Sequence, residues 1–230
     1  MGGDLSPRRL LRAYSSGIFP WFDAEQPILW WAPNPRMVLL AGQFHASRSF
    51  KKRLRTTPFT LTVNQHFDEV IAACAAPRKQ EQGTWIIPAM QAAYGELHRL
   101  GVAHSVEVLL EEQLVGGLYG VAIGRAFFGE SMFSRVADAS KTAFAALAVQ
   151  LNAGLLELVD CQVSNPHLSQ LGAKEISRSD FETLLISAIT EQREWLDIAH
   201  RVDPSDWPKR SPSEWLTTLP SCALTVLGAL

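Results

Sequence analysis

Apolar side chains recur every three or four residues in two central segments of the chain, which is the spacing of one face of an α-helix. In residues 67–74 the apolar positions are Phe67, Val70, Ile71 and Cys74. The second segment lies between Pro88, which suits the first turn of a helix, and Gly101, which suits a helix end. Its apolar positions are Met90, Tyr94, Leu97 and Leu100. Each pattern predicts an amphipathic helix.

Capping residues delimit two further helices. Ser6, followed by a proline, and Gly17 bound a short helix near the start of the chain. Asp138 or Ser140 begins another helix, and Gly154 ends it.

Apolar and polar residues alternate between residues 105 and 133, which is the period of a β-strand. We predict a three-stranded antiparallel meander there, with turns at residues 111–113 and 124–125. Residues 155–163 form the next predicted strand. Because a helix precedes that strand, the connection is a crossover that makes the strand parallel to the last strand of the meander.

A capping box, Ser179-x-x-Glu182, begins a last long helix. The predicted order is helices, then a meander, then a crossover. This order resembles the acetyltransferase-type (GNAT-type) fold, an α+β fold with a mixed sheet flanked by helices. In that fold two parallel strands splay apart, and the cleft between them holds the acyl donor.

Aromatic residues and prolines crowd into residues 17–40. Because prolines interrupt both helices and central strands, we predict an ordered loop that ends in a strand near residues 37–40.

Composition excludes several classes of protein. With 230 residues, 47% of them hydrophobic and 19% charged, the chain suits a globular protein rather than a disordered one. Cys74, Cys161 and Cys222 lie far apart, which argues against a disulfide framework or a cysteine-rich zinc site and fits a reducing cytosol. No segment has the roughly 20 consecutive apolar residues of a membrane span, and the start lacks the apolar core of a signal peptide. We therefore expect a cytoplasmic protein without membrane contact.

Positive charge is concentrated in one segment. Residues 26–67 contain no Asp or Glu, whereas the net charge of the whole chain is -2. The basic residues of this segment are Arg36, Arg48, Lys51, Lys52, Arg53 and Arg55. Such a segment indicates either a contact with a polyanion or a solvated loop or helix face.

Three polar residues occur at the centres of otherwise apolar strands. Strand periodicity places Glu130 on one face with Phe128 and Met132, and places Asp160 and Gln162 together on one face of the next strand. Buried polar groups need partners, so these residues either satisfy one another in a structural network or bind a ligand.

Other kinds of chemistry lack their motifs. Ser131 is not part of a G-x-S-x-G nucleophile elbow, and no P-loop motif occurs. The six histidines show no metal-ligand spacing. We therefore expect neither a metal nor a cofactor.

Eight sequence strings carry a resemblance to a known family. In order along the chain they are GIFPWF, ILWWAPNPR, HASRSFKK, GTWI, VGGLYGVAIG, FFGESMFSR, ASKTA and LVDCQV. The chain resembles the bacterial leucyl/phenylalanyl-tRNA-protein transferases from residue 2 to about residue 181. The resemblance implies a transfer of Leu or Phe, and less readily Met, from aminoacyl-tRNA to the N-terminal Arg or Lys of a protein. The added residue marks that protein for degradation. We expect the enzyme to be a monomer.

The resemblance also implies a substrate site. Trp21 and Trp85 would sandwich the 3′-terminal adenosine of the tRNA, although core packing is the common role of a tryptophan. Glu130 would hold the ammonium group of the aminoacyl residue. The aminoacyl side chain would enter an apolar pocket, or the same residues would form ordinary core. These residues are Leu118, Phe127, Phe144, Leu147, Leu151 and Val159.

Asp160 and Gln162 match the reactive pair of the family. Asp160 would accept a hydrogen bond from the Gln162 amide and polarise its carbonyl oxygen toward the attacking amine. Because an amide is a weak base, we expect orientation to be its main contribution. The six basic residues would bind acceptor-stem phosphates.

Departures from the family define the expected domains. We expect a small, truncated N-terminal domain in residues 1–35, a catalytic domain in residues 36–185, and a divergent helix and tail in residues 186–230.

Two alternative functions remain open. An acyl-CoA-dependent N-acetyltransferase normally has a glycine-rich turn where this chain reads RVADASKTA, and a non-catalytic tRNA-binding module would not need Asp160 and Gln162.

Overall fold

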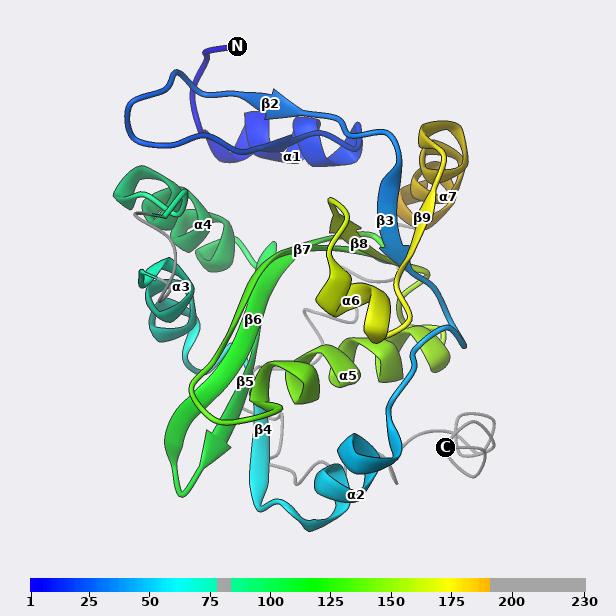
Figure 1. Ribbon diagram of the computed structural model, residues 1–230. Coiled ribbons are helices and arrows are strands. Elements are labelled where there is room, and N and C mark those ends of the chain that lie inside the picture. The colour runs from blue at the N-terminus through cyan, green and yellow to red at the C-terminus, as the bar shows by residue number, and fades with distance from the viewer. Residues whose placement is uncertain (78–83, 191–230) are drawn as a thin grey trace.

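The computed structural model describes residues 1–77 and 84–190 (Figure 1). Its helices are α1 (Pro7–Ser15), α2 (Arg48–Thr56), α3 (Phe67–Ala75), α4 (Pro88–Arg99), α5 (Ala139–Asn152), α6 (Pro166–Gln170) and α7 (Arg178–Thr190). Its strands are β1 (Phe19–Pro20), β2 (Trp30–Trp31), β3 (Arg36–Leu39), β4 (Phe59–Val63), β5 (Ala103–Leu110), β6 (Gln113–Ile123), β7 (Ala126–Ser134), β8 (Leu158–Gln162) and β9 (Lys174–Ile176).

One seven-stranded sheet organises the molecule, in the order β4-β5-β6-β7-β8-β3-β9. The strands β5, β6 and β7 form the predicted meander, and α5 connects β7 to β8, which runs parallel to it. The parallel register covers three residue pairs and ends at Phe128 and Asp160, whereas β7 continues to Ser134. The two parallel strands therefore part at this point, and the predicted acetyltransferase-type arrangement is confirmed.

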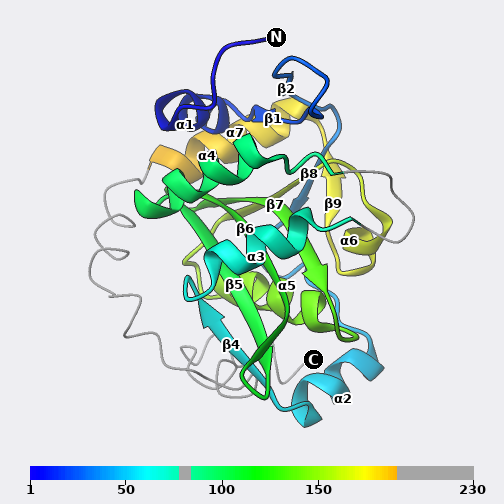
Figure 2. The same ribbon diagram turned by 90° about the vertical axis from the view of Figure 1, so that its left-hand side faces the viewer.

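The two faces of the sheet have separate cores. One, which we call the α3/α4 core, joins buried residues of α1, α3, α4 and α7, including Tyr14, Tyr94 and Phe181. The other, the α5 core, packs the buried face of α5 on the opposite side, around Phe144 and Leu147. Figure 2 shows α1, α4 and α7 gathered at one end of the molecule and α2 at the other.

The N-terminal segment is built into the α3/α4 core. Leu10, Tyr14 and Phe19 are at most 2% exposed and belong to the same cluster as Phe181 of α7. Gly17 ends α1 as predicted, at φ +67°, and a Cβ atom there would lie 2.6 Å from the Phe181 ring. This close approach requires glycine and brings α1 and α7 together.

Most of the predicted elements are confirmed. The apolar series of α3 and α4 is buried except Leu100, which follows α4 and is 54% exposed, so its assignment to the buried face is wrong. The capping box is also misplaced. Ser179 lies inside α7, and the hydroxyl of Ser177 instead accepts the backbone N–H of Asp180 at 3.1 Å.

Other elements were not predicted. The basic segment contains α2 and β4, and the aromatic loop contains a hairpin in which β1 pairs with β2. The short elements α6 and β9 follow β8. Residues 191–230, which include Cys222 and most of the expected tail, lie outside the described residues.

Candidate active site

Glu130 lies at the centre of a buried polar group, just past the point where β7 and β8 separate. Tyr119 pairs with Ser131 and Gly120 pairs with Gly129, so Glu130 has no partner on β6 and forms a β-bulge. The bulge shifts the alternation of β7. Met132 therefore packs against the α5 core and does not share the face of Glu130, contrary to the prediction from strict alternation.

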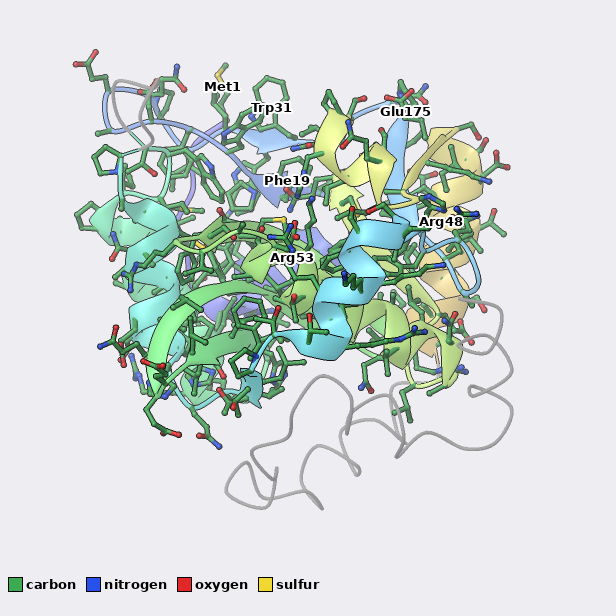
Figure 3. The ribbon with its side chains drawn as sticks, turned by 60° about the horizontal axis from the view of Figure 1, so that its bottom comes forward. Met1, Phe19, Trp31, Arg48, Arg53 and Glu175 are labelled. Carbon is green, nitrogen blue, oxygen red and sulfur yellow. The ribbon has the colours of Figure 1, made fainter. Side chains whose placement is uncertain are left out.

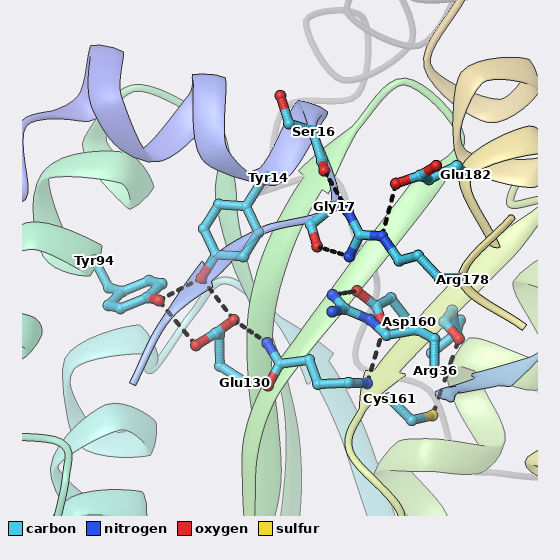
Figure 4. Close-up of polar contacts among 12 residues, drawn as sticks. Tyr14, Ser16, Gly17, Arg36, Tyr94, Glu130, Asp160, Cys161, Arg178 and Glu182 are labelled. Carbon is cyan, nitrogen blue, oxygen red and sulfur yellow. Dashed lines mark hydrogen bonds and ion pairs between the residues drawn. The ribbon is translucent and has the colours of Figure 1, made fainter. Parts of the chain in front are cut away.

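Two tyrosines that the sequence analysis did not identify as site residues hydrogen-bond to this carboxyl group (Figure 4). The Tyr14 hydroxyl donates to Glu130 Oε1 at 2.6 Å, and the Tyr94 hydroxyl donates to Oε2 at 2.8 Å. The two hydroxyls also contact each other, and both residues are fully buried. Two helices, α1 and α4, thus converge on one carboxyl group.

Gln162 completes the group around Glu130. Its side-chain Nε2 donates to Glu130 Oε1 at 2.7 Å, which joins β8 to β7 beyond the end of their backbone pairing. The amide carbonyl oxygen takes no part in this bond. Of the two possibilities that the sequence left open for these residues, the structure shows that Glu130 and Gln162 satisfy one another.

Burial dominates the electrostatics of Glu130. Removal from water raises its pKa from 4.5 to about 7, although the hydrogen bonds from Tyr14, Tyr94 and Gln162 act in the opposite direction. Burial, followed by the charge of Glu130, raises the pKa of both tyrosines well above the ordinary value. The tyrosines are therefore hydrogen-bond donors at neutral pH, and Glu130 is poised to ionise when a cation is bound beside it.

Asp160 has a different partner from the predicted one. Its Oδ1 accepts the backbone N–H of Gln162 at 2.9 Å, whereas the side-chain amide of Gln162 is directed to Glu130. Arg36 donates to Oδ1 from Nε at 2.8 Å and to Oδ2 from Nη2 at 2.5 Å. Asp160 therefore does not polarise the Gln162 amide directly.

The prediction that Arg36 binds a phosphate together with the five other basic residues is wrong. Its side chain is 0% exposed and ion-paired with Asp160, so it cannot meet a phosphate at the protein surface. Its charge alone suggested a phosphate contact, and nothing in the pattern of charges reveals that β3 enters the sheet beside β8.

Four of the other basic residues share one surface on α2. Arg48, Lys51, Lys52 and Arg55 line a hollow of about 240 Å³ together with Thr56. Arg53 points elsewhere and pairs with Asp138 at the start of α5 at 2.9 Å; Lys141 pairs with the same carboxylate at 3.0 Å. Figure 3 shows both Arg48 and Arg53 on this helix.

The two predicted adenosine-binding tryptophans have different surroundings. Trp21 is 40% exposed, and its ring lies 5.6 Å from that of Trp31, whose Nε1 donates to the Trp21 carbonyl oxygen. Trp85 is half-buried and packs against the α3/α4 core. The ring partner that the structure gives Trp21 is thus Trp31 rather than Trp85.

The predicted apolar pocket residues come together in the α5 core. All six are at most 5% exposed; they are Leu118, Phe127, Phe144, Leu147, Leu151 and Val159. Phe127 of β7 pairs with Val159 of β8. The next pair, Phe128 and Asp160, is the last one before the two strands separate. The apolar cluster and the polar group therefore meet at the same point of the sheet from opposite faces.

The described residues contain neither a cluster of metal-ligating side chains nor a helix that could span a membrane. Within residues 1–77 and 84–190, no group of three or more His, Cys, Asp or Glu residues is placed to hold a metal ion. The helices of the same ranges are too short or too polar to cross a membrane.

Comparisons of the sequence with family models and with curated proteins agree on one family. A family model described as leucyl/phenylalanyl-tRNA protein transferase matches residues 38–186, and the model of its N-terminal domain matches residues 3–34. The leucyl/phenylalanyl-tRNA–protein transferase of Hahella chejuensis is 55% identical over 80% of this chain and 79% of that protein. The transferase of Shewanella baltica is 52% identical over 90% of this chain and 84% of that protein. A solved GCN5-related N-acetyltransferase from Kribbella flavida is a distant likeness, with 9% identity, a TM-score of 0.38, and coverage of 74% of this chain and 61% of that chain.

Proposed function

The chain belongs to the leucyl/phenylalanyl-tRNA protein transferase family, and we propose that the polar group between β7 and β8 is its transfer site. The protein is an aminoacyltransferase that moves an aminoacyl residue from tRNA to the N-terminus of a protein. The acceptors that we propose begin with Arg or Lys, and the modified protein is marked for degradation. We also propose that the reaction takes place in the cytoplasm.

One bond is exchanged for another in the reaction. The α-amine of the acceptor attacks the ester carbonyl carbon of the aminoacyl-tRNA, and a C–N bond forms. The C–O bond to the terminal ribose breaks, and the departing ribose oxygen takes up the proton that the amine loses. Because the ester is already activated, the main task of the enzyme is to hold the amine in line with the carbonyl group.

The hydrogen bond from Gln162 to Glu130 is the observation that carries this proposal. Because Nε2 donates to Glu130, the amide is held in one orientation, and its carbonyl oxygen remains an acceptor for the incoming amine. Glu130 binds the ammonium group of the aminoacyl residue. That cation favours the ionised carboxylate, although burial alone raises the pKa of Glu130 to about 7.

The surrounding residues support substrate binding on both sides of this pair. The α5 core, which meets the polar group at Phe127 and Val159, receives the apolar side chain of Leu or Phe. Trp21 is exposed enough to stack on the terminal adenosine, with Trp85 as the proposed opposite wall. The hollow on α2, lined by Arg48 and its basic neighbours, binds acceptor-stem phosphates.

An acyl-CoA-dependent activity is disfavoured by the start of α5. In an N-acetyltransferase of this fold type, backbone N–H groups at this helix start would bind pyrophosphate. Here Asp138 occupies the N-cap position, and its carboxylate pairs with Arg53 and Lys141. The helix start therefore lacks the glycine-rich turn that would bring backbone N–H groups onto a pyrophosphate, because residues 135–143 contain no glycine.

The test uses radiolabelled leucine on Leu-tRNA and two peptides that differ only in their first residue, Arg or Met. We expect label on the Arg peptide alone. Gln162→Ala should abolish transfer and preserve tRNA affinity, whereas Gln113→Ala, at an exposed position of β6, serves as the control. Label on both peptides contradicts the acceptor rule. Label on neither, with tRNA still bound, favours the binding module.

A further inference from the structure

Arg36 lies inside the sheet, not on the surface. It is the first residue of β3, which pairs with β8 on one side and with β9 on the other. The side chain is 0% exposed, although arginine is among the residues least often buried. A fully buried guanidinium needs a specific partner.

That partner is Asp160. The guanidinium meets the carboxylate as a two-pronged fork, with Nε on Oδ1 at 2.8 Å and Nη2 on Oδ2 at 2.5 Å. Two parallel bonds of this kind fix the plane of the carboxylate as well as its position. A lysine ammonium in the same place supplies the charge without the fork.

Two aromatic rings also contact the guanidinium. It lies 4.8 Å from the centre of the Phe19 ring and 4.6 Å from that of Phe181. Phe19 belongs to the N-terminal hairpin and Phe181 to α7, so Arg36 joins two distant segments to β8. Its orientation is therefore determined by packing as well as by charge.

The effect reaches Gln162 through its backbone. Met37 pairs with Gln162 and Val38 with Asp160, so Cys161 is the extra residue of a bulge in β8. Gln162 has a φ of +65°, in the left-handed region that non-glycine residues rarely adopt. In this conformation its N–H reaches Asp160 Oδ1 at 2.9 Å, and its side chain reaches Glu130.

We propose that Arg36 is a positioning residue of the transfer site, which orients the Asp160 carboxylate so that Gln162 keeps its left-handed backbone and presents its amide to Glu130. This inference rests on the proposed function of Gln162 and Glu130. Arg36 itself touches no substrate. It acts through Asp160, and Asp160 acts through the backbone of Gln162.

Arg36→Lys is the first test, because it keeps the charge and removes the fork. The rate constant of leucine transfer to the Arg peptide is measured in single turnover, and the dissociation constant for Leu-tRNA is measured separately. We expect the rate constant to fall roughly 10- to 100-fold, with tRNA affinity unchanged. The matched control is Arg99→Lys, an exposed residue paired with Glu96 on α4, which should change neither quantity.

Two results of this test overturn the proposal. A normal rate constant in Arg36→Lys means that charge is sufficient and orientation is not needed. Weaker tRNA binding with a normal rate constant means that Arg36 acts on the tRNA, as its charge alone suggested.

A second variant keeps the proposal testable if Arg36→Lys fails to fold. The double variant Arg36→Met/Asp160→Asn removes both buried charges and retains a carbonyl acceptor for the Gln162 N–H. Its thermal melt establishes that it is folded. We expect transfer to stay slow by roughly tenfold or more, because nothing fixes the plane of the amide that replaces the Asp160 carboxylate. A folded double variant with a normal rate constant overturns the proposal, since Arg36 then only neutralises Asp160.

Failure of the underlying function has a separate signature. If the unmodified protein transfers no leucine to the Arg peptide, or if Gln162→Ala transfers it normally, the proposed site is wrong irrespective of Arg36.

Discussion

Arginines from one acid-free stretch of sequence lie in opposite environments. Arg36 is completely buried, and its guanidinium contacts one carboxylate and two aromatic rings. Arg48 and Arg55 of α2 are exposed and share a hollow with two lysines. The first environment uses the shape of the guanidinium, whereas the second uses mainly its charge, which salt screens. Neighbouring positive charges in a sequence can therefore have different roles. The role of each residue depends on the strand or helix that carries it.

The largest expected difference between buried Arg36 and the exposed arginines of α2 is in the free energy of unfolding. Arg36→Met leaves Asp160 buried without a counter-ion, which should cost about 3–5 kcal/mol of the free energy of unfolding. Arg55→Met should change it by less than about 0.5 kcal/mol, because the side chain is exposed. Urea denaturation followed by tryptophan fluorescence measures both values. Similar losses in the two variants would remove the distinction.

The pH dependence of stability extends the comparison to Glu130, another buried ionisable residue. Burial raises the pKa of Glu130 from 4.5 to about 7, so the folded protein keeps a proton that the unfolded chain has already lost. The stabilisation is fully present below about pH 4.5 and is lost as the pH rises through about 7, with a size on the order of 3 kcal/mol. Glu130→Gln cannot ionise, so its unfolding free energy should lack this decline.

His104 also contributes to the pH dependence of the unfolding free energy. Burial lowers the pKa of His104 from 6.5 to about 4, so protonation of His104 destabilises the fold as the pH falls through this range. As the pH falls, the contribution of His104 to the free energy of unfolding therefore decreases, whereas that of Glu130 increases. The difference between the unmodified protein and Glu130→Gln, measured by urea denaturation at pH 5 and pH 7.5, removes the common contribution. Parallel profiles for the two proteins would show that Glu130 ionises normally in the folded state.

Salt dependence separates buried Arg36 from the exposed cations of α2, which form the proposed tRNA-binding surface. Each exposed cation that meets a phosphate contributes about 1 to the slope of log affinity against log salt concentration. We expect Arg55→Gln to reduce the slope by about 1 and Arg36→Lys to leave it unchanged. Filter binding of Leu-tRNA across a salt series measures it. A reduced slope in Arg36→Lys would place that residue on the tRNA.

The smallest expected effect concerns Arg53, whose surroundings are intermediate between those of buried Arg36 and those of exposed Arg48 and Arg55. It is 47% exposed and paired with Asp138, which is 14% exposed. Asp138→Asn should change stability by less than about 1 kcal/mol, because the pair is partly solvated and asparagine tolerates the left-handed φ of +67°. It should also tighten tRNA binding modestly, since the positive charges of Arg53 and Lys141 are then no longer neutralised. Weaker binding would show that the pair is needed to hold α2 in place.

The central part of the fold and of the site could be predicted from local patterns. Alternation in FFGESMF and LELVDCQV placed Glu130, Asp160 and Gln162 in adjacent strands, and a connecting helix predicted the parallel pair. These inferences need only residues that are near one another in the sequence. The segment 59–63 also alternates, with Phe59 and Leu61 buried, and could have been recognised as a strand.

The partners of the site residues could not be predicted in the same way. Tyr14 is 116 residues from Glu130, and Arg36 is 124 residues from Asp160, so no periodicity links them. The bulges at Glu130 and at Cys161 add one residue to a strand without a distinctive sequence, and they change the direction of every later side chain. These contacts depend on how distant segments meet in three dimensions.

The insertion of β3 between β8 and β9 has a consequence for the order in which the protein is made. During synthesis, Arg36 leaves the ribosome 124 residues before Asp160, a delay of roughly 6 to 25 s at typical elongation rates. The meander can assemble in that interval, because its strands are neighbours in the chain, but β3 has no strand to join. An unfinished chain therefore carries a hydrated guanidinium and an unformed site, and the capacity to modify other proteins arises only when most of the polypeptide has been made.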